Sequence, residues 1–263
     1  MFPNLSFFGL TLPSYTLMLC LGAAVFLALL LYKGKKEGLD KRELLFVGIF
    51  VLGCCVIGAK LLYALVTFLN STYQVAVHFR EGIAKGFIYL FSGFVYYGGV
   101  IGGLIGVRIY CRINASNIDR LFSAGFVGIP LMHAIGRIGC FLAGCCYGIE
   151  YEGFGAVTFP SSAANPVEVS RFPVQLLSAA VDLIIFAALS VIRRREKTAA
   201  ALFGSYLLMY GAARFAVEFL RGDILRGVWG GLSTSQYLSI LAVGAGIWLL
   251  VRAKVRRSKI IGR

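Results

Sequence analysis

Long runs of apolar residues, separated by short polar connections, make up most of the chain. Seven of these runs are long enough to cross about 30 Å of hydrocarbon as helices that rise about 1.5 Å per residue. The pattern therefore predicts an all-α integral membrane protein with seven transmembrane helices in one membrane domain, residues 1–263. The predicted spans are 13–32, 44–69, 94–111, 121–143, 174–192, 199–219 and 235–252.

The composition supports this fold class. Hydrophobic residues make up 59% of the chain and charged residues only 14%, whereas a soluble domain has about 25% charged residues. These values exclude a soluble enzyme, a disordered chain and a small disulfide scaffold. The net charge of +14 would suggest nucleic-acid binding in a soluble chain, but membrane proteins concentrate Lys and Arg in cytoplasmic loops. We expect no nucleic-acid partner.

Basic residues are concentrated in alternate connections, which predicts the orientation. The basic segments follow the first, third, fifth and seventh spans, at 33–42, 108–120, 193–197 and 252–263. The other connections hold only Arg80, Lys85, Arg171, Arg221 and Arg226. Because the basic side of a membrane protein faces the cytoplasm, we expect the N-terminus outside and the C-terminus in the cytoplasm.

The two longest connections lie on the predicted outer side. Residues 70–93 form an amphipathic stretch typical of the membrane interface. Residues 144–173, between the fourth and fifth spans, are too polar to cross the membrane and rich in glycine and proline. Long loops that are not linkers are often functional, so we expect a structured outer loop here and chemistry at the outer leaflet.

Apart from the basic segments and the connections, three basic residues remain, and all lie inside predicted spans: Lys60, Arg137 and Arg214. Each lies late in a span that runs outward, so all three are expected in the outer half of the bilayer. Charge inside a membrane is costly and usually functional, and arginine binds phosphate as a fixed fork. The three cations therefore favour an anionic headgroup site. The alternative is that each side chain separately extends to the outer headgroups.

The segment from His133 to Gly148 has the highest density of chemically active residues. His133, Arg137 and Cys140 are spaced to share one helix face. A histidine, a guanidinium and a thiol on one face can supply a base, a phosphate clamp and a nucleophile. Alternatively, His133 bonds a backbone carbonyl and Cys140 only packs.

Three of the seven cysteines, Cys140, Cys145 and Cys146, cluster at the end of the fourth span. They are candidates for a redox pair, for soft-metal ligands or for nucleophiles. Their spacing is not a standard zinc pattern, and the chain has only two histidines. The sequence therefore assigns no metal site, and we expect no cofactor.

The end of the sixth span repeats the pattern of charge on one helix face. Arg214, Glu218 and Arg221 are spaced i, i+4, i+7, so Glu218 can neutralise one arginine and leave the other for an anion. An internal salt bridge is the alternative. Asp182, in the middle of the fifth span, needs a partner or a proton, and Lys60 is a candidate partner.

These residues resemble the prolipoprotein diacylglyceryl transferase family, in matching order over nearly the whole chain. Gly136-Arg-Ile-Gly-Cys-Phe141 resembles its Gly-Arg-Leu-Gly-Asn-Phe signature, and Tyr210-Gly-Ala-Ala-Arg214 with Glu218-Phe-Leu-Arg221 resembles its late arginine block. Shorter similarities lie at Pro13-Ser-Tyr15, Gly58-Ala-Lys60, Tyr97-Gly-Gly-Val-Ile-Gly102 and Pro173-Val-Gln175.

The resemblance implies a seven-helix enzyme of the bacterial inner membrane with its active site on the exported side. Such an enzyme moves the diacylglyceryl group of phosphatidylglycerol onto a lipobox cysteine of a preprolipoprotein and releases glycerol phosphate. Arg137, Arg214 and Arg221 would hold the headgroup, supported by Tyr15 and Glu218. The remaining substrate-binding candidates are Lys60, Gly139, Gly148 and Gln175.

The chain departs from the family pattern around the expected reaction centre. Tyr97 stands where the family has a histidine, Cys140 where it has an asparagine and Cys145 where it has a glutamate. Tyrosine is a poor base near neutral pH because its usual pKa is about 10, so His133 is a candidate replacement. The catalytic candidates are therefore His133, Arg137, Tyr97, Cys140 and Arg214.

Two interpretations follow. Retention of the arginines favours a diacylglyceryl transferase-like enzyme that acts on a phospholipid and a thiol. The cysteine cluster favours the same fold used for thiol redox chemistry, soft-metal handling or transport. The sequence leaves the oligomeric state open.

Overall fold

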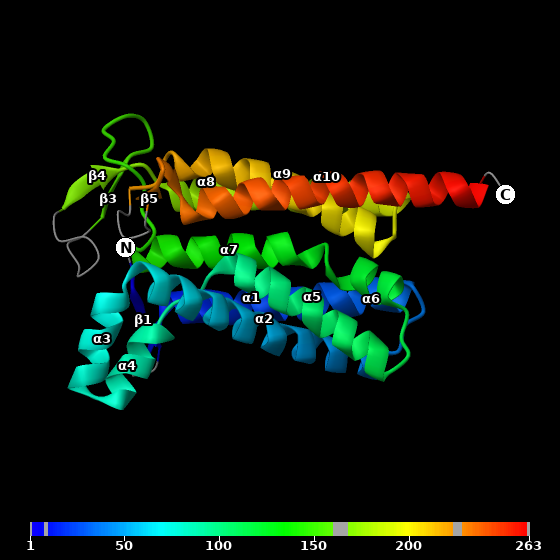
Figure 1. Ribbon diagram of the computed structural model, residues 1–263, viewed down its shortest axis with the longest axis horizontal. Helices are drawn as coiled ribbons and strands as arrows, with labels where there is room; N and C mark the ends of the chain where they lie inside the picture. The colour runs from blue at the N-terminus through cyan, green and yellow to red at the C-terminus, as the bar shows by residue number, and fades with distance from the viewer. Residues whose placement is uncertain (1, 8–9, 160–167, 223–227, 262–263) are drawn as a thin grey trace. The chain divides into compact units, whose positions relative to one another are not determined.

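The computed structural model of the chain describes residues 2–7, 10–159, 168–222 and 228–261 (Figure 1). Helices make up most of these residues, and short β-hairpins lie in the connections. The chain divides into two compact units. Unit 1 comprises residues 1–30 and 123–263, and unit 2 comprises residues 31–122. The single membrane domain stays a prediction.

Six helical stretches of the described chain are long and apolar enough to cross a membrane. They are α1 (Ser14–Lys36), α2 (Lys41–Asn70), α6 with α7 (Ile118–Gly125 and Gly128–Ala143), α8 (Val174–Arg195), α9 (Ala199–Glu218) and α10 (Thr234–Ile261). The predicted third span is α5 (Tyr96–Ile113), which contains several glycines and two arginines and is not among these six. The helices confirm a helical membrane protein, while the count of seven spans stays a prediction.

The helix bounds differ from the predicted spans in two ways. Helices α1 and α10 continue past the apolar runs into basic segments, because cations stabilise the carboxyl end of a helix. The predicted span 121–143 is divided by a turn at residues 126–127. Pro130 explains this break, since its ring clashes with the carbonyl four residues earlier.

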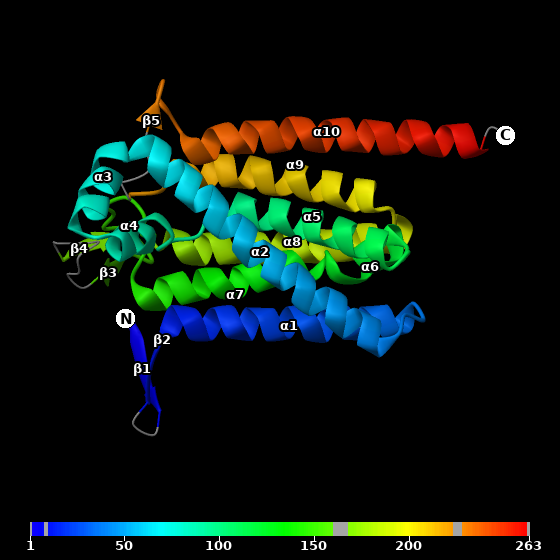
Figure 2. The ribbon, with the colours of Figure 1, turned by 60° about the horizontal axis from the view of Figure 1, so that its bottom comes forward.

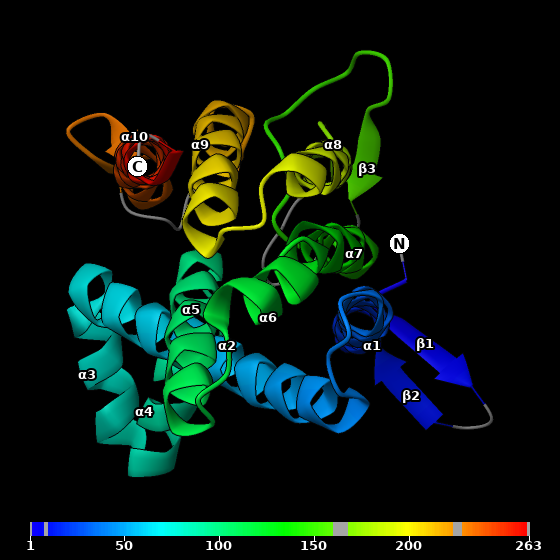
Figure 3. The ribbon, with the colours of Figure 1, turned by 90° about the vertical axis from the view of Figure 1, so that its right-hand side faces the viewer.

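Helices α7, α8, α9 and α10 of unit 1 each pack on the next in chain order, and α1 lies against α7 (Figure 3). Glycines allow the closest approaches. A Cβ on Gly246 of α10 would lie 2.8 Å from the Gly204 carbonyl oxygen of α9, and one on Gly139 of α7 would lie 2.8 Å from Met18 Cβ of α1. Large side chains such as Leu202 and Tyr206 fill the core between the helices.

Three two-stranded antiparallel hairpins lie in unit 1: β1 (Asn4–Phe7) with β2 (Leu10–Pro13), β3 (Val157–Phe159) with β4 (Val169–Arg171), and β5 (Val228–Trp229) with β6 (Leu232–Ser233). They lie at the same end of the unit as the last turn of α7 and the first turn of α8 (Figure 2). The sequence did not predict them, because strands of two to four residues are too short for a periodic pattern. Part of the predicted loop 144–173, residues 160–167, lies outside the described residues.

Unit 2 is built on a tight contact between α2 and α5. A Cβ on Gly98 or Gly102 of α5 would collide with the backbone of Gly58 and Cys54 in α2, as expected for a small-residue packing motif. The predicted amphipathic stretch forms two short helices, α3 (Thr72–Glu81) and α4 (Ile83–Leu90), joined at Gly82. Its position at the membrane interface stays a prediction.

Candidate active site

Helices α7 and α8 face each other through three polar contacts that follow one another along the helix axes. His133, Arg137 and Cys140 lie on one face of α7, as predicted. On α8, Gln175, Ser178 and Asp182 have the matching spacing and also share a face. These residues or their neighbours form three contacts between the helices. The contacts follow one another over about 10 Å, the length of seven helical residues at about 1.5 Å each.

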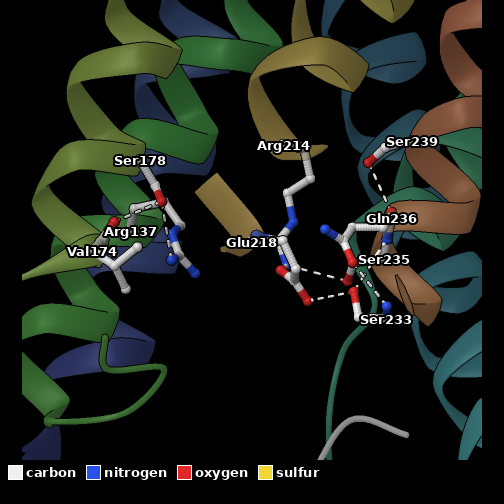
Figure 4. Close-up of polar contacts among 9 residues, drawn as sticks. All are labelled: Arg137, Val174, Ser178, Arg214, Glu218, Ser233, Ser235, Gln236 and Ser239. Atoms are coloured by element: carbon white, nitrogen blue, oxygen red, sulfur yellow. Dashed lines mark hydrogen bonds and ion pairs between the residues drawn. The ribbon is translucent and has the colours of Figure 1, made fainter. Parts of the chain in front are cut away.

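Arg137 makes the middle contact, and this residue is 9% exposed. Its Nη2 donates to Ser178 Oγ at 3.3 Å, and Ser178 Oγ donates to the Val174 carbonyl at 2.7 Å (Figure 4). Its Nε has no hydrogen-bond partner, and no acidic side chain of the described residues pairs with it. Since a buried charge without a partner is costly, this guanidinium is suited to bind an anion.

The deeper contact joins His133 to Asp182. His133 Nδ1 lies 2.9 Å from Asp182 Oδ2, and the Asp182 side chain is only 2% exposed. The Tyr210 ring of α9 packs edge-on against the imidazole at 5.7 Å. Within unit 1, the partner of Asp182 is therefore His133, where the sequence had offered Lys60 as a candidate. Lys60 Nζ instead donates to the Phe91 carbonyl at 2.5 Å within unit 2.

The contact nearest the hairpin end joins α8 to the loop after α7. Gln175 is fully buried, and its Nε2 donates to the Cys145 carbonyl at 2.8 Å. The loop turns at Gly144, which has φ +73°, and at Cys146, which has φ +57°. This double left-handed turn brings the sulfur atoms of Cys140, Cys145 and Cys146 within 4.8 Å of one another.

Cys145 and Cys146 of this cluster lie beyond the end of α7, outside the helical spans. Hydrogen bonding with the Cys140 thiol raises the pKa of Cys145 above its usual range, and bonding with Cys146 and burial act in the same direction. With a raised pKa the sulfur keeps its proton at neutral pH, so Cys145 is a poor nucleophile by itself.

A second polar group lies between the end of α9 and the start of α10. Arg214 Nη2 lies 2.5 Å from Glu218 Oε2 and donates to Ser235 Oγ at 3.2 Å. Glu218 Oε1 accepts from Ser233 Oγ at 2.8 Å, and both charged side chains are largely buried. Figure 4 shows this group on one side and Arg137 with Ser178 on the other. Glu218 therefore neutralises Arg214, as the helix spacing predicted.

Backbone pairing ties the loop after α7 to the segment after α9. Gly148 N donates to the Phe172 carbonyl at 3.2 Å, and Ile149 N donates to the Leu220 carbonyl at 3.0 Å. Gly148 and Arg221 form an antiparallel bridge, and a Cβ on Gly148 would collide with the Phe172 carbonyl. The predicted candidates Gly148 and Arg221 therefore lie side by side. Three chain segments converge at Gly148, where no side chain larger than that of glycine fits.

Of the other candidates, Tyr15 and Gly139 also come together. A Cβ on Gly139 would lie 3.5 Å from Tyr15 Cα, so the first turn of α1 contacts α7 beside the cysteine cluster. Tyr97, in the first turn of α5, and Lys60 belong to unit 2. Their part in the site stays a prediction.

Comparison with known proteins identifies the family. A family model described as prolipoprotein diacylglyceryl transferase matches residues 3–252. The chain belongs to the prolipoprotein diacylglyceryl transferase family. A relative named phosphatidylglycerol–prolipoprotein diacylglyceryl transferase 2, from Clostridium perfringens, is 32% identical over 97% of this chain and 96% of its own length. The corresponding transferase of Clostridium tetani is 34% identical over 92% of this chain and 93% of its own, and that of Campylobacter lari is 30% identical over 92% and 89%.

Membership in this family of transferases confirms the resemblance drawn from the arginine motifs and gives no support to the alternative that the fold serves thiol redox chemistry, soft-metal handling or transport. The sequence analysis nevertheless missed several polar residues at the site. The sequence pattern could have indicated Ser178, because it shares one helix face with Gln175 and Asp182 in an otherwise apolar span. No such pattern indicates Ser233, Ser235 and Gln236, since only the packing of α10 on α9 brings them to Arg214 and Glu218.

Proposed function

We propose that the chain transfers the diacylglyceryl group of phosphatidylglycerol to the cysteine thiol of a prolipoprotein. The thiol sulfur forms a bond to the terminal glyceryl carbon, and the bond from that carbon to the phosphate oxygen breaks. Glycerol phosphate leaves with the electron pair, and the thiol proton goes to a base. Family membership and the relatives' names support this reaction.

The proposal depends chiefly on the environment of Arg137. Its guanidinium is buried, with a neutral serine as its hydrogen-bond partner and with an unsatisfied Nε. A phosphodiester can accept a fork of two hydrogen bonds from this group and neutralise its charge. As the phosphate leaves, its charge grows, so the arginine stabilises the transition state more than the bound lipid.

We propose that His133 is the base that accepts the thiol proton. A carboxylate 2.9 Å from Nδ1 favours the tautomer that carries its proton there, which leaves Nε2 as an acceptor. Asp182 also stabilises the imidazolium that forms when the base accepts a proton. In this assignment His133 performs the task for which Tyr97, in the place of the family histidine, is chemically unsuited.

The remaining candidates position the lipid. Arg214 and Arg221 flank the headgroup, with Glu218 holding Arg214 in place through the ion pair and Ser233. The further substrate-binding residues in this assignment are Tyr15, Lys60, Gly139, Gly148 and Gln175.

We also infer seven spans, with α5 as the third, and the active site at the exported face of the bacterial inner membrane. The basic connections support this orientation, and the arginines lie near the helix ends that it places outside. The headgroup of an outer-leaflet phospholipid would then lie at the depth of Arg137 and Arg214.

The test uses purified protein in detergent with phosphatidylglycerol and a lipobox peptide, and measures peptide mass and released glycerol phosphate. We expect a diacylglyceryl mass increase, lost in Arg137→Ala and reduced at least tenfold in Arg137→Lys, which keeps the charge but not the fork. Arg252→Lys, an arginine beside Trp248 on α10, is the matched control. Absence of product, with a family enzyme active in parallel, would refute the proposal.

A further inference from the structure

The three clustered cysteines have a geometry that the transfer reaction described above does not require. Their sulfur atoms lie within 4.8 Å of one another, although Cys145 and Cys146 follow the end of α7 and Cys140 lies within it. Cys146 adopts φ +57°, a conformation that costs energy in a residue with a side chain. The loop thus accepts strain and turns its two thiols back toward the helix.

The donor set and spacing suit a thiophilic metal ion. Zinc–thiolate bonds of about 2.3 Å place two sulfurs on one ion about 3.7–4.0 Å apart, within a small adjustment of the cluster. The cluster consists only of thiols, and thiolates select Zn²⁺ and Cu⁺ over hard cations. Three protein ligands leave a fourth position of a tetrahedral Zn²⁺ open, as in catalytic zinc sites.

The surrounding charge favours the same ion. Zn²⁺ with three thiolates has a net charge of −1. Arg137 lies on the same helix face as Cys140, one turn away. The guanidinium, which has no acidic partner among the described residues, can offset that charge. Cys140 is buried while Cys145 and Cys146 are partly exposed, so the open position can be reached from the loop.

We propose that Cys140, Cys145 and Cys146 form a Zn²⁺ site whose open position binds the acceptor thiol of the transfer reaction. The second half of this statement rests on the proposed function. Metal coordination deprotonates a thiol at neutral pH, and the proton goes to the base of the reaction. The sulfur then attacks the glyceryl carbon as glycerol phosphate leaves, and the thioether product, a weaker ligand, dissociates from the ion.

The binding test uses Co²⁺, whose visible absorption reports thiolate ligands and tetrahedral geometry where Zn²⁺ is spectroscopically silent. The protein is reduced with a phosphine, so that no added thiol competes, and a thiol titration verifies that all seven cysteines are reduced. We expect one Co²⁺ per chain with thiolate charge-transfer bands that Zn²⁺ abolishes. Absence of the bands in the wild-type protein would overturn the proposal.

Matched variants locate the site. Cys140→Ser and Cys146→Ala should each weaken Co²⁺ binding by about tenfold or more, since each removes one ligand. The control is the double substitution Cys54→Ser with Cys55→Ser, an adjacent cysteine pair in α2, which should bind Co²⁺ like the wild type. Bands that persist in Cys140→Ser, or that disappear in the control, would refute the assignment. Gel filtration in detergent excludes variants that do not fold.

The acceptor role has its own readout. A lipobox peptide should change the Co²⁺ spectrum by adding a thiolate, whereas the same peptide with serine in place of cysteine should not. Chelation should abolish transfer and Zn²⁺ should restore it. An unchanged spectrum, or transfer that survives chelation, would refute the acceptor role while leaving the proposed function intact. Metal binding without any transfer would instead refute the proposed function.

Discussion

At the residue scale, Arg137 and Arg214 of unit 1 have opposite electrostatic environments. Arg214 is neutralised by Glu218 at 2.5 Å, whereas the side chain that bonds Arg137 within the described residues is the neutral Ser178. A neutralised guanidinium holds a structure together, and an uncompensated one attracts an anion. From this difference we propose a positioning role for Arg214 and a phosphate-binding role for Arg137, although the sequence motifs look alike.

The base assignment predicts a specific order among three substitutions. His133→Gln should lower kcat by about 100-fold or more, the usual contribution of a general base, with little change in the KM for phosphatidylglycerol. Asp182→Asn keeps the imidazole and should lose less activity, and Tyr97→Phe should lose least. Steady-state kinetics on monodisperse protein measure this order. A larger loss in Tyr97→Phe than in His133→Gln would assign the base to Tyr97.

At the element scale, antiparallel packing of consecutive helices builds the site. Because α7 and α8 run in opposite directions, residues counted back from the end of α7 meet residues counted forward from the start of α8. The same rule joins the end of α9 to the start of α10, where Ser233 and Ser235 reach Glu218 and Arg214. Small residues control how closely these pairs approach.

The contact between α9 and α10 predicts opposite effects for two glycines that lie two residues apart. An alanine Cβ at Gly246 would lie 2.8 Å from both the Gly204 carbonyl and the Leu208 amide nitrogen, whereas at Gly244 it would meet nothing within 4 Å. Gly246→Ala should therefore destabilise the protein by about 1–3 kcal/mol through overpacking. Gly244→Ala should be neutral or stabilising by up to about 1 kcal/mol.

Thermal unfolding in detergent measures both variants against the wild type. Equal unfolding midpoints for the two variants would contradict the packing of α10 on α9 through this glycine seam.

At the scale of the whole molecule, the apolar surface and the charge distribution are those of a membrane protein. Large apolar side chains are exposed along the spanning helices, for example Phe46 and Phe68 on α2 and Leu241 on α10. Such a surface would cause aggregation in water but is satisfied by lipid tails. Lysine and arginine gather at alternate connections, which sets the expected orientation.

This orientation predicts the result of reporter fusions along the chain. Alkaline phosphatase fused after Glu81, between α3 and α4, should be active, because it requires export. The same enzyme fused after Asn114, beyond α5, should be inactive, while green fluorescent protein should fluoresce there and at Arg263. Equal phosphatase activity at Glu81 and Asn114 would show that α5 does not cross the membrane.

By itself, the sequence determined the membrane class, the approximate helices, the family and the arginine and glycine motifs. Apolar runs and same-face spacing are local properties, because each depends on residues within one helix. It also predicted correctly that Glu218 would neutralise an arginine, since both residues lie on α9 and are four apart.

Only the tertiary structure decided which residues meet across helices. It gave Asp182 the partner His133, and it gave Arg137 the neutral partner Ser178. It also brought Cys145 and Cys146 back to Cys140. It also divided the fourth span ahead of Pro130 and placed Gly148 where three segments converge. These outcomes depend on helix packing and on the direction in which a loop leaves a helix, which no pattern within one segment encodes.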